Sequence, residues 1–85
     1  MEKLIKILAL TNNTILISEI VEVGADVGEP DCKLTNPFVV KQDQTMEPFL
    51  FEFTAQDTFM ISSDKILTLA DPTETLLSKY FDLTA

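Results

Sequence analysis

The sequence predicts a mainly β domain: a small, strongly bent, five-stranded antiparallel barrel followed by one C-terminal α-helix. Aliphatic and β-branched runs of strand length alternate with turn residues over the first 70 residues. The second run is apolar on both of its faces, and a helix-start signature follows residue 70. At 85 residues the chain is expected to form a single domain over residues 1–85, with the barrel at 4–70 and the helix at 71–83.

The first two strands are expected to form a hairpin. Residues 4–10 and 14–23 are apolar runs joined by Thr-Asn-Asn, and asparagine tolerates the left-handed backbone of a tight turn. The first run also imitates a secretory signal, but Lys6 interrupts it and no small-residue cleavage site follows, which favours a strand. The second run places apolar residues on both faces: Ile15, Ile17, Val21 and Val23 with Glu19 on one, Leu16 and Ile20 on the other. A bend or bulge would let this strand serve two walls of a barrel.

The three later strands follow a loop over residues 24–31, which contains both glycines and a proline. Residues 32–41 alternate, with Cys32, Leu34, Phe38 and Val40 inward, and Pro37 indicates an edge position or a bulge. The fourth strand covers residues 48–61, interrupted by Thr-Ala-Gln-Asp. Its row of Phe49, Phe51 and Phe53 is interpreted as a core or interface stripe rather than a platform for stacking bases. The last strand covers residues 65–69 after a short polar turn.

The C-terminal segment carries the signals of a helix start. Asp71 is the predicted cap, Pro72 the first helical residue, and Glu74 stands three residues after the cap. An apolar stripe then follows at helical spacing: Leu76, Leu77, Tyr80 and Phe81. We expect this stripe to cover an open end of the barrel or to contact a neighbouring subunit.

The composition limits the function classes. The net charge is -8, with six lysines and no arginine, so the overall field repels nucleic acid and anionic membranes. This charge is compatible with acid-rich solubility, with a basic protein as partner, or with a small cationic patch on an oligomer. The chain has no histidine, phosphate-binding loop or Cys-x-x-Cys motif, which argues against an enzyme and against a cofactor. Because 46% of the residues are apolar, we expect a buried interface between subunits.

The single cysteine and a cluster of carboxylates are the remaining candidate sites. The single cysteine, Cys32, alternates inward and is interpreted as an inert core thiol of a reduced, cytoplasmic protein. Asp26, Glu29 and Asp31 crowd the loop at residues 24–31, but the spacing of a calcium-binding loop is absent. We interpret them as a solvated acidic loop and expect no metal.

The order of the strands resembles the Sm/LSm-like RNA-binding family. In that family's second motif an aliphatic residue, a cation and glycine, polar residues and a further aliphatic run follow one another. Here Ile61, Ser62, Ser63, Asp64, Lys65, Ile66, Leu67 and Leu69 stand in that order, with serines at the cation and glycine positions. The hairpin of the first motif corresponds to Leu10, Thr11, Asn12 and Asn13, and the match covers about residues 4–70.

The resemblance implies a homo-oligomeric ring in which an edge strand of one subunit pairs with an edge of the next. It also implies single-stranded RNA binding at the loops before the third strand and between the last two strands, through Lys33, Asn36, Ser62, Ser63 and Lys65. A ring would multiply one weak cationic site by the number of subunits. The alternative is a protein-interaction or structural subunit on the same fold, without RNA binding.

Overall fold

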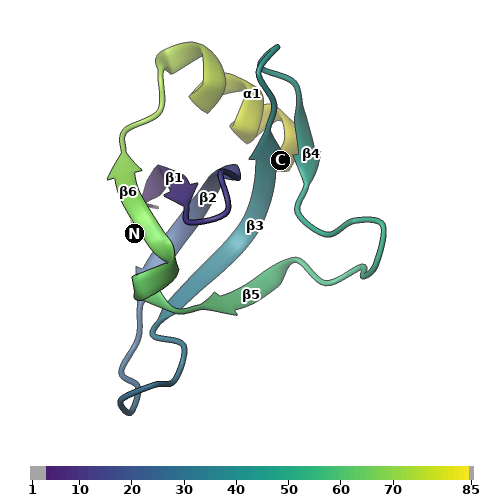
Figure 1. The fold of residues 1–85 in the computed structure, drawn as a ribbon. Coiled ribbons are helices and arrows are strands. Elements are labelled where there is room, and N and C mark those ends of the chain that lie inside the picture. Colours follow the sequence, from purple (N-terminus) through teal and green to yellow (C-terminus); the bar gives the residue numbers. More distant parts are fainter. Residues whose placement is uncertain (1–3, 85) are drawn as a thin grey trace.

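The computed structural model describes residues 4–84 and confirms a mainly β, antiparallel fold with a C-terminal helix (Figure 1). In chain order the elements are β1 (Ile5–Leu10), β2 (Ile15–Glu22), β3 (Cys32–Val40), β4 (Met46–Pro48), β5 (Thr58–Ile61), the 3-10 helix η1 (Ser63–Lys65), β6 (Ile66–Ala70) and α1 (Glu74–Thr84). The first hairpin forms as predicted, with Asn13 in the left-handed conformation at φ 67°. None of the helices described over residues 4–84 is long and apolar enough to cross a membrane.

The sheet is open and does not close into the predicted barrel. Its strand order is β4-β3-β2-β1-β6, and β5 pairs with the part of β3 that β4 leaves free. The short helix η1 connects β5 directly to β6, but the two strands diverge from it (Figure 1). β5 pairs with β3 and β6 pairs with β1, so they lie on opposite sides of β2 in the strand order. Residues 4–84 form six strands rather than five. Of the predicted fourth strand, at residues 48–61, only its end forms β5, while β4 begins at Met46, before the predicted start, and shares only Pro48 with it.

The residues between β4 and β5 correct the prediction of an aromatic strand. Phe49, Phe51 and Phe53 lie in consecutive turns, and no strand is formed over residues 49–57. Leu50 takes the left-handed conformation at φ 60°, which breaks the extended backbone. Phe53 is 82% exposed and Phe51 51% exposed, so the row is not a core stripe. We call residues 49–57 the aromatic loop.

A β-bulge in β3 explains why this strand contributes to two cores. Ile17 faces Phe38 and Glu19 faces Thr35, so Asn36 and Pro37 together oppose the single residue Ser18. The bulge confirms one of the two interpretations of Pro37, but it also shifts the side-chain alternation by one residue. Phe38 and Val40 therefore do not join Cys32 and Leu34, and lie in the second cluster instead.

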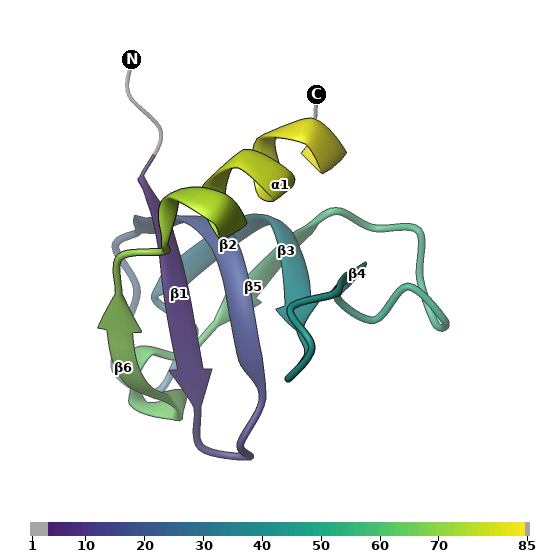
Figure 2. The ribbon, with the colours of Figure 1, turned by 90° about the horizontal axis from the view of Figure 1, so that it is seen from above.

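Hydrophobic clusters occupy both faces of the sheet. The larger one holds buried residues from β1, β2 and β3: Leu8, Leu10, Leu16, Ile20, Cys32 and Leu34. The second lies where α1 crosses the other face (Figure 2) and centres on Ile5, Ile17 and Tyr80, with Leu76 and Leu77 packed against it. Both apolar faces of β2 therefore contribute to a core: one face packs within the larger cluster formed by the bent sheet, and the other packs against α1.

The start of α1 differs from the predicted cap. The Thr73 hydroxyl accepts a hydrogen bond from the Leu76 amide at 3.3 Å, so Thr73 caps the helix. Asp71 instead forms an ion pair with Lys6 on β1, which ties the helix approach to the first strand. Of the predicted stripe, Tyr80 is buried, whereas Phe81 packs edge to face with Tyr80 and stays 46% exposed.

Tyr80 anchors α1 to the bulge. Its hydroxyl accepts a hydrogen bond from the Glu19 amide at 3.2 Å and lies 3.1 and 3.0 Å from the carbonyl oxygens of Thr35 and Asn36, which share its proton. Burial raises the pKa of this hydroxyl above its ordinary value of 10.0, more than the Glu19 amide lowers it. The helix therefore supplies the polar partner that the interrupted ladder at Asn36 and Pro37 lacks.

Candidate functional site

The polar turn between β5 and β6 is held by a carboxylate. Asp31 accepts hydrogen bonds from the Ser63 amide at 2.7 Å and from the Ser63 hydroxyl at 2.8 Å. The Ser63 backbone donor, followed by the hydroxyl, lowers the pKa of Asp31 below its ordinary value of 3.8. On the other side, the Thr11 amide donates to the Lys65 carbonyl at 3.0 Å. The turn thus joins the loop at residues 24–31 to the first hairpin.

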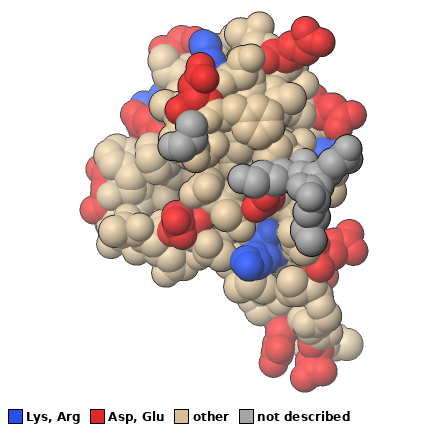
Figure 3. Space-filling view, turned by 180° about the vertical axis from the view of Figure 1, so that it is seen from behind, with Lys and Arg blue, Asp and Glu red and all other residues tan. Residues whose placement is uncertain are grey.

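The surroundings of this turn are acidic. A shallow cavity of about 160 Å³ beside it is lined by Glu29, Asp31, Asp64 and Ser62 among others. Figure 3 shows acidic side chains at the tip of the protruding loop between β2 and β3 and around the rim of the molecule. Within residues 4–84, no group of three or more potential metal-ligating side chains converges. Within this acidic loop, Asp31 has a structural role, because it holds the turn at Ser63.

The five residues predicted to bind RNA do not form one site. Ser62 and Ser63 lie at the end of β5 beside Asp31, and Lys65 is exposed in η1. Lys33 is exposed on β3, between Val21 and Met60 of the neighbouring strands. Cys32 pairs with Ile61 in antiparallel register, so Ser62 lies level with position 31, five residues before Asn36. At about 3.3 Å per residue, Asn36 is roughly 16 Å from Ser62 along the strand. RNA contact at these residues stays a prediction, and it would have to bridge two separate places.

The outer edges of β5 and β6 are the first of two surfaces that stand out. Over residues 4–84, β6 pairs with β1 alone and β5 with β3 alone, so each has one side without a strand partner. Apolar side chains stay exposed on both: Met60 on β5, and Leu67 and Leu69 on β6, the last two 67% and 49% exposed. A trough of about 260 Å³ floored by Ile20, Cys32 and Ile66 runs along β6.

Cys32 in this trough has no chemical activation. It is buried, and burial, followed by the negative charges of Asp31 and Glu22, raises the pKa of its thiol above 9.0. A thiol with a raised pKa is a poor nucleophile at neutral pH. Both the position and the electrostatics agree with the interpretation of Cys32 as an inert core thiol.

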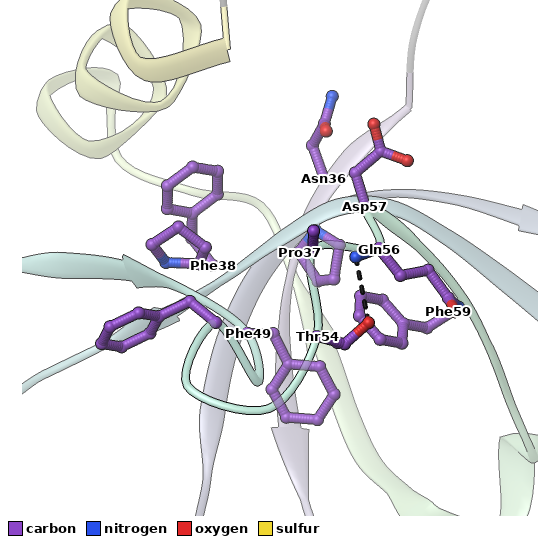
Figure 4. A pocket seen from close by; sticks show the side chains of 11 residues that line it. Asn36, Pro37, Phe38, Phe49, Thr54, Gln56, Asp57 and Phe59 are labelled. Carbon is purple, nitrogen blue, oxygen red and sulfur yellow. Dashed lines mark hydrogen bonds between the residues drawn. The ribbon is translucent and has the colours of Figure 1, made fainter.

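The second surface is a pocket of about 340 Å³ beneath the aromatic loop, which we call the loop pocket (Figure 4). Its apolar lining includes Pro37 and Phe38 from β3, Phe49 and Phe51 from the loop, and Phe59 from β5. Phe49 and Phe59 pack edge to face with ring centroids 5.5 Å apart. The polar lining comes from Asn36, Gln56 and Asp57.

The bulge positions this pocket. The Asn36 amide donates to the Asp57 carbonyl at 2.7 Å, and the Phe49 amide donates to the Pro37 carbonyl at 2.8 Å, so both ends of the aromatic loop are fastened to the bulge. Inside the loop, the Gln56 amide donates to the Thr54 hydroxyl at 3.1 Å, the bond drawn in Figure 4. Sequence reasoning missed the pocket, although Pro37 and Pro48, neither of which can donate to a ladder, signalled an interrupted edge.

Comparison with known families corrects the resemblance stated above. Residues 3–85 match a family described as "Family of unknown function (DUF6561)", so the assignment to the Sm/LSm-like family is wrong. That assignment rested on the order of apolar and polar residues, which many small β domains share. A search of curated proteins finds no match for this chain. The match spans nearly the whole sequence, and the chain therefore belongs to the DUF6561 family.

Proposed function

We propose that this protein is a non-catalytic structural subunit that associates with further copies of itself through two of the free strand edges of its sheet, those of β5 and β6. The observation that carries the proposal is the pair of open edges, β5 and β6, each bearing exposed apolar side chains. Exposed strand edges bind other strands unless they are covered, charged or distorted. A head-to-tail contact between β6 of one copy and β5 of the next would cover both edges at once.

The lengths and chemistry of the two edges support this contact. β5 has four residues and β6 has five, so the two can pair without leaving a long overhang. On its inner side β6 pairs with β1 at Ile66 and again at residues 68–70, and the register shift leaves Leu67 without a partner in β1. The exposed side chain of Leu67 is then free to pack against the neighbouring copy. Repeated head-to-tail contacts give a ring if the rotation closes and a filament if it does not.

The charge of the chain makes the assembly testable through salt. Each copy carries a formal charge of -8, so copies repel one another, and added salt screens this repulsion. We therefore expect assembly to strengthen as ionic strength rises. RNA binding has the opposite dependence, because salt weakens contacts between lysines and phosphates.

The experiment is sedimentation velocity over a concentration series at low and high ionic strength, with Leu67→Lys as the test variant. We expect the wild type to sediment as an oligomer and Leu67→Lys as a folded monomer, because an edge lysine opposes strand addition. Val27→Lys is the matched control, since Val27 is fully exposed in the loop at residues 24–31 and the charge change is the same. A wild type that stays monomeric at every concentration would refute the proposal.

An oligoribonucleotide titration on the same samples separates the RNA prediction from the assembly. We expect U-rich and A-rich oligoribonucleotides to bind weakly at most, because acidic side chains surround Ser62 and Ser63. Saturable binding that Lys65→Glu abolishes would instead favour RNA as the ligand of the assembled subunits.

A further inference from the structure

The loop pocket is independent of the two sheet edges and carries a second inference. Its walls come from the bulge of β3, the aromatic loop and β5, and the backbone hydrogen bonds at Asn36 and Pro37 hold it in place. Phe49 and Phe59 are partly buried in its floor, while Phe51 remains half exposed at its mouth. A half-exposed aromatic side chain beside a fixed apolar pocket is a feature of contact sites rather than of solvent-facing turns.

The charges around the pocket have one sign. Asp57 is the single charged residue of its lining, and the other charged residue of the aromatic loop is Glu52. The lysine on the neighbouring turn, Lys41, is already paired with Glu47 at 2.7 Å. The hydrogen bond and charge of Glu47, with smaller effects of Asp43 and Glu52, raise the pKa of Lys41, so carboxylates dominate this end of the molecule.

The size and lining of the pocket define what fits. A volume of about 340 Å³ is at the lower end of the roughly 300–1,000 Å³ of ligand pockets, so it holds one or two side chains of a partner rather than a folded surface. Aromatic faces attract a cation from above, and the methylene stem of arginine or lysine packs against apolar walls. In Figure 4 the side chains of Asn36 and Asp57 lie side by side, away from the ring of Phe49.

We propose that the loop pocket binds an extended segment of a partner protein, placing an arginine or lysine side chain beside Asp57 and an adjacent aliphatic side chain against Phe49 and Phe51. The charge of -8 would draw such a basic segment toward the molecule, and the pocket would give the contact its position. This inference does not depend on self-association, because the pocket uses neither the outer edge of β6 nor the exposed side chain of Leu67.

The probe is a random heptapeptide library displayed on phage and selected against the full chain at low ionic strength. We expect enrichment of peptides in which arginine or lysine stands next to an aliphatic residue. A resynthesised peptide should shift the backbone amide signals of Asn36, Phe49 and Asp57 in a two-dimensional nitrogen–proton spectrum. Leu67→Lys should bind the same peptide as well as the wild type does, which separates this inference from the assembly.

Two variants and two matched controls locate the binding. Asp57→Asn should lower the affinity for the peptide about fivefold, the usual scale for a partly exposed ion pair. Phe51→Ser should lower it about tenfold, the usual scale for an aromatic contact. Asp26→Asn and Val27→Ser make the same kinds of change on the exposed loop at residues 24–31 and should leave the affinity unchanged. All four substituted side chains are exposed, so the variants and the controls should keep the fold.

Several results would overturn the inference. Failure of the library to enrich any peptide, or enrichment of acidic or uncharged ones, would contradict the cationic partner. Peptides that bind Asp57→Asn and Phe51→Ser as tightly as the wild type would move the site elsewhere. A U-rich oligoribonucleotide that shifts the same amides would assign the aromatic side chains to base stacking instead.

Discussion

Removing the hydroxyl of Tyr80 tests how the helix stabilises the sheet. In Tyr80→Phe the ring still fills its site, where the side chain is only 2% exposed, so the change isolates the polar contacts. The Glu19 amide loses its acceptor, and the Asn36 carbonyl loses its share of the donated proton. The Thr35 carbonyl keeps a shared donor, because the Ser18 hydroxyl lies 3.1 Å from it and 2.8 Å from the Glu19 carbonyl.

The expected cost follows from these contacts. Leaving a buried polar group without a partner costs about 1–3 kcal/mol. Because Ser18 still donates in part to the Thr35 carbonyl, we expect Tyr80→Phe to lower the free energy of unfolding by about 2 kcal/mol, the middle of that range. For a domain of this size, each kcal/mol lowers the melting temperature by about 4–8 °C, so the variant should melt about 8–16 °C lower. Urea unfolding followed by circular dichroism measures the free energy directly.

The control is Ser78→Ala, which removes an exposed hydroxyl from the same helix and should change the free energy of unfolding by less than about 0.5 kcal/mol. The pH dependence gives a second readout. Because the pKa of Tyr80 is raised above 10.0, its stabilisation is complete below that pH and is lost as the pH rises through the folded-state pKa. The wild type should therefore lose its advantage over Tyr80→Phe at alkaline pH. Equal stabilities of the two proteins at neutral pH would refute the reasoning.

Two further predictions concern single groups. The pKa of Asp31, followed by carbon-detected NMR, should lie below 3.8 and rise toward that value in Ser63→Ala, because one of the two Ser63 donors is removed. The contribution of Asp31 to stability is present above pH 3.8 and is lost as the pH falls through its lowered pKa; an unchanged pKa in Ser63→Ala would contradict the hydrogen-bond assignment. Cys32 should react slowly with an aromatic disulfide reagent in the native protein and rapidly in urea, because it is buried and its pKa is raised. Rapid reaction of the native protein would show that the trough along β6 opens.

Local patterns predicted most of the elements. The two apolar runs joined by Thr-Asn-Asn became β1 and β2, the segment with both glycines became the loop at residues 24–31, and the polar turn became η1 between β5 and β6. These features depend on contacts between near neighbours in the chain, such as a left-handed asparagine or an interrupted apolar run. The sequence also indicated an edge position or a bulge at Pro37, of which the bulge is confirmed, and an inward Cys32.

The placement of side chains depended on partners distant in the sequence. Asp71, the predicted helix cap, instead forms an ion pair with Lys6, 65 positions earlier in the chain, and Thr73 caps the helix in its place. Phe49, Phe51 and Phe53 have the spacing of a strand, but Pro37 interrupts the edge of β3 with which that strand would pair. Their spacing alone therefore gave the wrong structure.

In the candidate site, too, some features followed from the sequence and others from tertiary contacts. The sequence by itself determined the acidic charge and the positions of β1, β2, β3 and β6. Only the tertiary structure decided that the bulge at Asn36 and Pro37 would shift the alternation of β3, fasten the aromatic loop and receive the Tyr80 hydroxyl. The physical reason is that a bulge is fixed by the cross-strand register, and the register is set by the packing of both faces of the sheet together.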